Sequence, residues 1–168
     1  AWGTALAVAY SQDHDVTLWS RDADHALSLR STHCNERYLP GIALPPGIAV
    51  SSDAASALKG CDLALVATPI AGLRAALESV ARSGAPAVLW ACKGFESGSG
   101  LLPHQVALDV LPAQVSRGAF SGPSFAIEVA RGLPTAITVA SDDIEFVSAL
   151  VASLHSPRLR LYANDDLI

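Results

Sequence analysis

Two uninterrupted apolar runs constrain the fold of this chain more than any other feature. The first, CDLALVATP, stops at Thr68 and Pro69, and the second, PAVLWACKG, stops at Lys93 and Gly94. A strand buried on both faces is apolar along its whole length, because helices cover both faces of a parallel sheet. A helical pattern over residues 70–82 separates the two runs. These segments therefore predict a strand, a helix and a parallel strand.

The same alternation extends over the rest of the chain. The stretch NERYLPGIALPPG contains three prolines and two glycines, so it is predicted as a loop. A helix that Ser52 or Asp53 could cap follows the strand at 48–50. The pattern predicts an α/β fold of the Rossmann type, a doubly wound, mainly parallel sheet with helices on both faces. The other predicted strands are 16–19, 118–124, 134–141 and 159–164, and the other predicted helices are an opening helix, 22–30, 101–110, 125–130 and 144–154.

Composition narrows the class of protein. With 168 residues, the chain suits one domain, predicted over residues 1–168 with no linker. Its net charge of −5 and lack of a basic cluster argue against nucleic acid as a partner. We find no apolar run of 18 residues and no signal peptide, so no membrane span is predicted. Cytoplasm is the expected location.

Metal binding has little support in the sequence. Cys34, Cys61 and Cys92 are odd in number and widely spaced, which fits neither a disulfide framework nor a zinc site. His33 beside Cys34 could be a pair of metal ligands, but no further ligands follow, and an ordinary loop explains both residues. No metal is predicted.

The first seven residues, AWGTALA, look like the second half of a dinucleotide fingerprint. That motif, Gly-x-Gly-x-x-Gly, lies at the turn from the first strand into the first helix, and its last glycine lets the two pack closely. Gly3 falls at the last glycine, with Ala1 and Trp2 before it. We therefore expect the first strand and two glycines to lie upstream of this chain.

Polar residues just after the predicted strands are candidate ligand contacts, since ligands bind beyond the carboxyl ends of such strands. Arg21 favours the 2′-phosphate of NADP, whereas the neighbouring Asp22 leaves NAD open, and a solvated arginine is the alternative. Lys93 could bind a phosphate or polarise a carbonyl, or could simply lie at the surface. In SGPSFAIE, Gly122, Ser124 and a helix start form a candidate anion site or an ordinary turn.

Taken in order, WGTALA, LWSRD, NERYLPGIALP, ACKGFE, SGPSFAIEVARGLPTAITVAS and LYANDDLI resemble the N-terminal domain of the bacterial NAD(P)-dependent glycerol-3-phosphate dehydrogenases. The resemblance covers essentially the whole chain. It implies an oxidoreductase that interconverts glycerol 3-phosphate and dihydroxyacetone phosphate by hydride transfer, for glycerophospholipid synthesis. The implied cofactor is NAD or NADP, with NADP favoured.

The resemblance also implies roles for individual residues. Lys93 would contact both cofactor and substrate, and Gly122 and Ser124 would bind glycerol 3-phosphate. Position 1, often serine in the family, is Ala1 here. The other implied cofactor contacts are Trp2 at the pyrophosphate, Gly3 in the fingerprint, Arg21 and Tyr38 near the adenosine end, and Ala126 against the dinucleotide.

Two parts of the family pattern are expected outside this chain. The general-base lysine should follow beyond Ile168, so no catalytic residue is assigned within the chain and the fragment alone should be inactive. A helical second domain completes the phosphate site in the family, and a homodimer could form through it. Two alternatives remain open: another Rossmann hydroxy-acid dehydrogenase, and a module that senses NAD(P) without chemistry.

Overall fold

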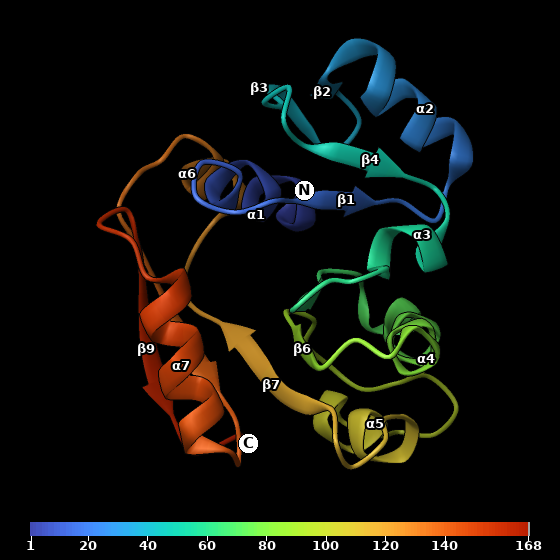
Figure 1. Ribbon diagram of the computed structural model, residues 1–168, viewed down its shortest axis with the longest axis vertical. Helices are drawn as coiled ribbons and strands as arrows, with labels where there is room; N and C mark the ends of the chain where they lie inside the picture. Colours follow the sequence, from blue (N-terminus) through green and yellow to red (C-terminus); the bar gives the residue numbers. More distant parts are fainter. Residues whose placement is uncertain (168) are drawn as a thin grey trace. The chain divides into compact units, whose positions relative to one another are not determined.

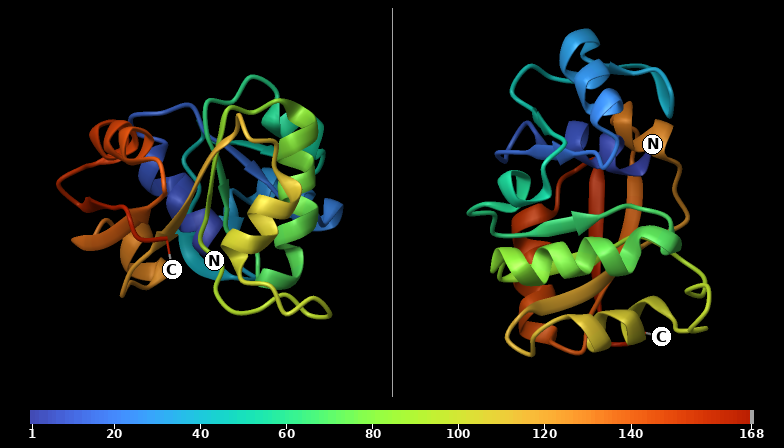
Figure 2. Two further views of the ribbon diagram at one scale, coloured as in Figure 1. Left: turned by 90° about the horizontal axis from the view of Figure 1, so that it is seen from below. Right: turned by 90° about the vertical axis from the view of Figure 1, so that its right-hand side faces the viewer.

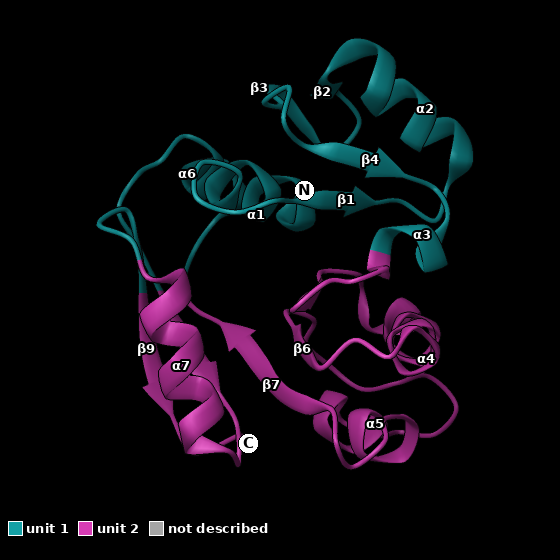
Figure 3. Ribbon diagram, viewed as in Figure 1, with its two compact units in different colours: residues 1–57, 123–136, 156–160 teal, residues 58–122, 137–155, 161–168 magenta. Residues whose placement is uncertain are grey.

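A computed structural model describes residues 1–167, which form two compact units (Figures 1 and 3). Unit 1 comprises residues 1–57, 123–136 and 156–160, and unit 2 comprises the other described residues. The expectation of a single domain stays a prediction.

Unit 1 is built around a short parallel pair of strands, β1 (Thr17–Trp19) and β4 (Ala49–Ser51). Helix α1 (Trp2–Tyr10) packs against β1, and helix α2 (Ala23–Thr32) packs against β4. Their apolar faces share a core that includes four fully or largely buried side chains. These are Ala7, Leu29, Leu44 and Ile48.

The predicted loop over NERYLPGIALPPG is wrong in part, because it contains an antiparallel pair. Strand β2 (Cys34–Asn35) pairs with β3 (Leu39–Ala43), and the register shifts between Cys34 and Asn35. Gly41 has a φ of 73°, which suits glycine. A proline and a left-handed glycine are tolerated in such a short, irregular pair, so composition alone hid it.

Unit 2 contains most of a five-stranded sheet in the order β5-β6-β7-β8-β9. The pairs β5–β6 and β6–β7 are parallel, whereas β7–β8 is antiparallel. The sheet is thus mainly parallel, as predicted. The strands are β5 (Ala64–Val66), β6 (Ala87–Trp90), β7 (Ser116–Ser121), β8 (Thr135–Ala140) and β9 (Leu159–Asn164).

Helices cover both faces of the sheet in unit 2. Helices α4 (Leu73–Ser83) and α5 (Pro103–Val110) lie side by side on one side of β7, and α7 (Ile144–Leu154) lies on the other (Figures 1 and 2). Leu73, Leu77 and Val106 are fully buried and belong to one apolar cluster with Val66 of β5 and Trp90 of β6. This confirms the predicted α/β architecture.

Several element boundaries differ from the expectation. The helix predicted over 70–82 starts as a 3-10 turn, η1 (Ile70–Gly72), before α4. The helix after β4, α3 (Ala54–Leu58), is capped by Asp53, whose carboxylate accepts from the amides of Ala55 and Ser56 at 3.3 and 3.0 Å. The remaining helix, α6 (Ala126–Ala130), has only five residues.

Tight packing at one glycine fixes the centre of the sheet. A Cβ added at Gly118, in β7, would lie 2.6 Å from the carbonyl oxygen of Ala140 and 3.0 Å from Cδ2 of Leu89. Glycine is therefore required where β7 passes between β6 and β8.

Candidate functional site

The start of α1 offers donors to an anion. Its first helical hydrogen bond runs from the amide of Ala5 to the carbonyl of Ala1, at 3.0 Å. The three preceding amides, including those of Trp2 and Gly3, have no acceptor within the helix. No side chain caps this end, and its first turn carries no acidic residue. Trp2 and Gly3 are both half-buried. A pyrophosphate would find unopposed donors here.

A buried hydrogen bond ties this helix to the Tyr38 segment. The side-chain amide of Asn35 donates to the hydroxyl of Thr4 at 2.7 Å, and its Oδ1 accepts from the Tyr38 amide at 3.1 Å. Both Asn35 and Thr4 are buried. Unit 1 thus brings Tyr38 and the start of α1 into one connected structure.

The aromatic ring of Tyr38 is flanked by Arg37 and His25. The guanidinium of Arg37 lies 5.0 Å from its ring centroid, and His25 meets it edge-on at 5.3 Å. Tyr38 as a residue remains 50% exposed. Such a surface can take a flat aromatic group such as adenine.

Arg21 and Asp22 both follow β1, but only the side chain of Asp22 has partners among the described residues. Asp22 caps α2: its Oδ1 accepts from the His25 amide at 3.1 Å, and its Oδ2 accepts from Arg37 at 3.2 Å. The His25 amide, and then Arg37, hold the pKa of Asp22 below its usual range. Arg21 is exposed and pairs with none of the described residues. The free charge at this end is therefore positive.

Ser124 and Ala126 lie at the start of α6, which packs against α1 within unit 1. The Oγ atom of Ser124 is buried and has no hydrogen-bond partner among the described residues. A buried hydroxyl without a partner is costly, so a ligand oxygen would satisfy it after rotation of the side chain. Because α6 is short and carries Glu128 in its first turn, the helix itself adds little to an anion site.

Lys93 and Gly122 follow two neighbouring parallel strands of unit 2, β6 and β7. Trp90 in β6 is in register with Ala119 in the parallel strand β7. Each site residue is three positions further along, so both lie at the carboxyl edge of the sheet. Lys93 is exposed and has no partner among residues 1–167. Its ammonium is available to a ligand.

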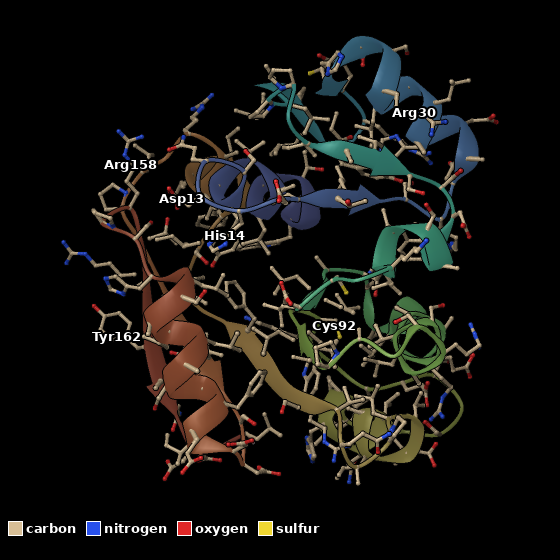
Figure 4. The ribbon with its side chains drawn as sticks, viewed as in Figure 1. Asp13, His14, Arg30, Cys92, Arg158 and Tyr162 are labelled. Carbon is tan, nitrogen blue, oxygen red and sulfur yellow. The ribbon has the colours of Figure 1, made fainter. Side chains whose placement is uncertain are left out.

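Cys92, labelled in Figure 4, directly precedes Lys93. Burial raises the pKa of its thiol, so the thiol is neutral at pH 7. It therefore adds no negative charge beside Lys93.

The loop that carries Lys93 is anchored by a residue to which the sequence reasoning gave no role. Glu96 accepts two hydrogen bonds from Arg74 on α4, from Nε to Oε1 at 2.8 Å and from Nη2 to Oε2 at 2.9 Å. Arg74 also pairs with Asp109 on α5, at 2.6 Å. The sequence reasoning also gave no role to Asn35. The pairs Arg74–Glu96 and Asn35–Thr4 each join residues that are distant in the chain, so no local spacing reveals them.

Within the described chain no three or more histidine, cysteine or carboxylate side chains gather in a metal-binding arrangement. His33 ends α2 in the left-handed conformation, and the thiol of Cys34 donates to Glu36. No helix in residues 1–167 is long and apolar enough to cross a membrane.

Known proteins similar to this chain point to one family. A family model described as the N-terminus of NAD-dependent glycerol-3-phosphate dehydrogenase matches residues 1–147. A relative from Dechloromonas aromatica, named glycerol-3-phosphate dehydrogenase [NAD(P)+], is 54% identical over the whole chain. One of the same name from Aromatoleum aromaticum is 51% identical. The chain spans 51% and 52% of these relatives, about half of their length.

A solved structure supports the same comparison. The crystal structure of a glycerol-3-phosphate dehydrogenase from Coxiella burnetii matches 99% of this chain with a TM-score of 0.89 and 34% identity. The chain covers 51% of that protein.

Proposed function

Because the chain belongs to the family of NAD-dependent glycerol-3-phosphate dehydrogenase N-terminal domains, we propose that the whole protein interconverts glycerol 3-phosphate and dihydroxyacetone phosphate. The resemblance predicted from the sequence is confirmed by that membership. Family membership favours this activity over the alternative of a different hydroxy-acid dehydrogenase. Bound NAD(P) would supply the hydride exchange at C2 of the substrate.

The residues of unit 1 fit a dinucleotide. The uncapped start of α1, with Trp2 and Gly3, would hold the pyrophosphate by its free amides. Tyr38 would lie by the adenosine end, and Ala126 on α6 would lie against the dinucleotide. The hydrogen bond between Asn35 and Thr4 supports this assignment, because it joins the Tyr38 segment to α1.

NADP is the proposed preference. NAD-binding sites of this type use a free carboxylate to accept from the ribose hydroxyls, whereas a nearby arginine accommodates the 2′-phosphate of NADP. Asp22 is committed to capping α2 and to Arg37, while Arg21 is unpaired and exposed. The available charge at this position suits a phosphate.

The observation that carries the substrate assignment is the unpaired Lys93, which lies three positions after Trp90, as Gly122 lies three positions after Ala119, the partner of Trp90 in the sheet. Lys93 would bind the substrate phosphate or polarise its carbonyl and also contact the cofactor. The family resemblance also assigns Gly122 and Ser124 to the substrate, and the Ser124 hydroxyl, which has no partner among the described residues, is free to accept or donate a hydrogen bond.

Four further parts of the proposal are not carried by the described residues. A lysine following residue 168 would act as general base within reach of the substrate hydroxyl. A homodimer would form through the remainder of the protein. The proposed location is the cytoplasm, consistent with the free thiols of the three cysteines, and the proposed role is supply of glycerol 3-phosphate for phospholipid synthesis.

The test uses the whole protein that contains this chain. Absorbance of the reduced nicotinamide is followed after dihydroxyacetone phosphate is added with NADPH, and separately with NADH. Substrate-dependent oxidation, faster with NADPH at subsaturating concentration, is the expected result. Binding of both cofactors without oxidation of either would instead support a sensing module.

A further inference from the structure

Residues 91–102 connect β6 to α5 without helix or strand, and Lys93 lies near the start of this loop. Three of its glycines, Gly94, Gly98 and Gly100, have positive φ values of 97°, 92° and 70°. Glycine at such positions gives the unfolded chain extra freedom, so ordering the loop costs more entropy. The loop therefore needs specific contacts to hold one conformation.

Glu96 supplies these contacts. Its amide donates to the carbonyl of Leu101 at 2.8 Å, and its carbonyl accepts from the amide of Gly100 at 2.9 Å. Its carboxylate accepts from the hydroxyl of Ser99 at 2.6 Å, and also from Nε and Nη2 of Arg74. The Glu96 side chain is only 14% exposed. One residue thus closes the loop and attaches it to α4.

Lys93 has no anchor of its own. It is exposed and unpaired within the described residues, and Phe95, between it and Glu96, is 67% exposed. On its other side, the chain is held by the Ala91 amide, which donates to Val66 of β5 at 2.9 Å. The segment that contains Lys93 is therefore held on one side at Ala91, by the sheet, and on the other at Glu96.

We propose that Arg74 and Glu96 are positioning residues that hold the loop so that Lys93 meets the phosphate-bearing substrate. This inference rests on the proposed function. The two-pronged geometry suits the purpose, because two parallel N–H···O contacts set orientation as well as distance. A small displacement of a binding group costs rate or affinity even when the fold is intact.

The experiment compares Glu96→Gln and Arg74→Lys in the whole protein. Each keeps much of the shape but breaks the charged, two-pronged contact. We expect a rise of about tenfold in KM for dihydroxyacetone phosphate, with a smaller change in kcat. Asp109→Asn is the matched control, since it removes a partner of Arg74 that does not belong to the loop, and its KM should stay near that of the wild type.

A double-mutant cycle separates positioning from general destabilisation. In a Lys93→Ala background, Glu96→Gln should raise KM little further, because the residue being positioned is gone. An equal rise of KM in both backgrounds, or an equal rise from Asp109→Asn, would overturn the inference.

Amide hydrogen exchange over residues 93–100 provides a readout that needs no substrate. Exchange should be faster in both Glu96→Gln and Arg74→Lys, and unchanged exchange would overturn the inference. If the wild type oxidises no NADPH with dihydroxyacetone phosphate, the proposed function fails. In that case faster exchange would still support loop positioning, whereas its substrate would need reassignment.

Discussion

The side-chain amide of Asn35 donates to the hydroxyl of Thr4 at 2.7 Å, and both side chains are buried. Thirty-one positions separate the two residues in the chain. Their bond joins the segment before Tyr38 to the helix whose start is proposed to hold the pyrophosphate. The proposed cofactor-binding segments are therefore tied to each other through the buried core of unit 1.

Replacing Asn35 by alanine should lower the free energy of unfolding by about 1–3 kcal/mol, because a buried hydroxyl and the Tyr38 amide lose a partner. Urea unfolding of the whole protein measures this. Thr4→Val should cost a similar amount, since it leaves the Asn35 amide unpaired. The double variant should be less destabilised than the sum of the two, and strict additivity would show that the bond contributes nothing.

Arg21→Ala should weaken NADPH binding about tenfold or more and leave NADH binding nearly unchanged, because only NADPH carries the 2′-phosphate. Fluorescence titration of the reduced cofactors measures both affinities. Asp22→Asn is an informative companion, since asparagine caps a helix as well as aspartate does but lacks the charge. It should tighten NADPH binding and change stability only slightly, because the ion pair with Arg37 that it gives up is exposed. Equal losses of both cofactors in Arg21→Ala would reject the assignment.

Lys93→Ala should raise KM for dihydroxyacetone phosphate by at least about tenfold, because a charge-assisted contact to the phosphate is lost. Its melting temperature should hardly change, since Lys93 has no partner within residues 1–167. Lys59 is the other lysine of the chain and is also exposed, which makes Lys59→Ala the matched control. Wild-type kinetics in Lys93→Ala would remove the residue from the site.

Gly118→Ala should destabilise the protein by about 1–3 kcal/mol, because the new methyl group meets the Ala140 carbonyl oxygen and Leu89. Thermal or denaturant unfolding provides the measurement. Gly47 has no atom within 4 Å of an added Cβ and no positive φ. Gly47→Ala is therefore expected to be neutral or slightly stabilising, and a comparable loss there would point to a general intolerance of alanine.

The stability contributed by Glu96 should depend on pH in a defined window. Arg74, and then Ser99, lower the pKa of Glu96 from 4.5 to about 2. A lowered folded-state pKa contributes stability that is complete above about pH 4.5 and is lost as the pH falls toward 2. Melting temperatures between pH 6 and 2 should fall more steeply for the wild type than for Glu96→Gln. Parallel curves would show that the carboxylate is not selectively stabilised.

Sequence patterns predicted the elements whose buried residues form a continuous run or recur at a regular spacing along the chain. Strand β6 is buried at all four positions, and α7 spans the predicted residues 144–154. The β2–β3 pair escaped prediction because Pro40 and Gly41 are typical of loops, and pairing across an irregular register leaves no periodic trace. Asp53, and not Ser52, caps α3. Both residue types can cap a helix, so the sequence alone could not decide between them.

Positions at strand ends could be located for the same reason, since the end of an apolar run can be recognised in the sequence. Lys93 stops the run that forms β6, and Gly122 directly follows β7, but their roles in binding stay predictions. Asn35 and Arg74 could not be predicted, because each acts through a partner more than twenty positions away. Only the folded chain brings such pairs together.

The anchored glycine-rich loop has a consequence for the thermodynamics of binding. Its conformational freedom is removed when the protein folds, through Glu96, and not when a ligand arrives. Ordering a flexible segment during association reduces affinity, and a loop already ordered avoids that loss. In its proposed role, Lys93 would therefore bind the substrate as a preorganised group, with little entropy given up by the backbone that carries it.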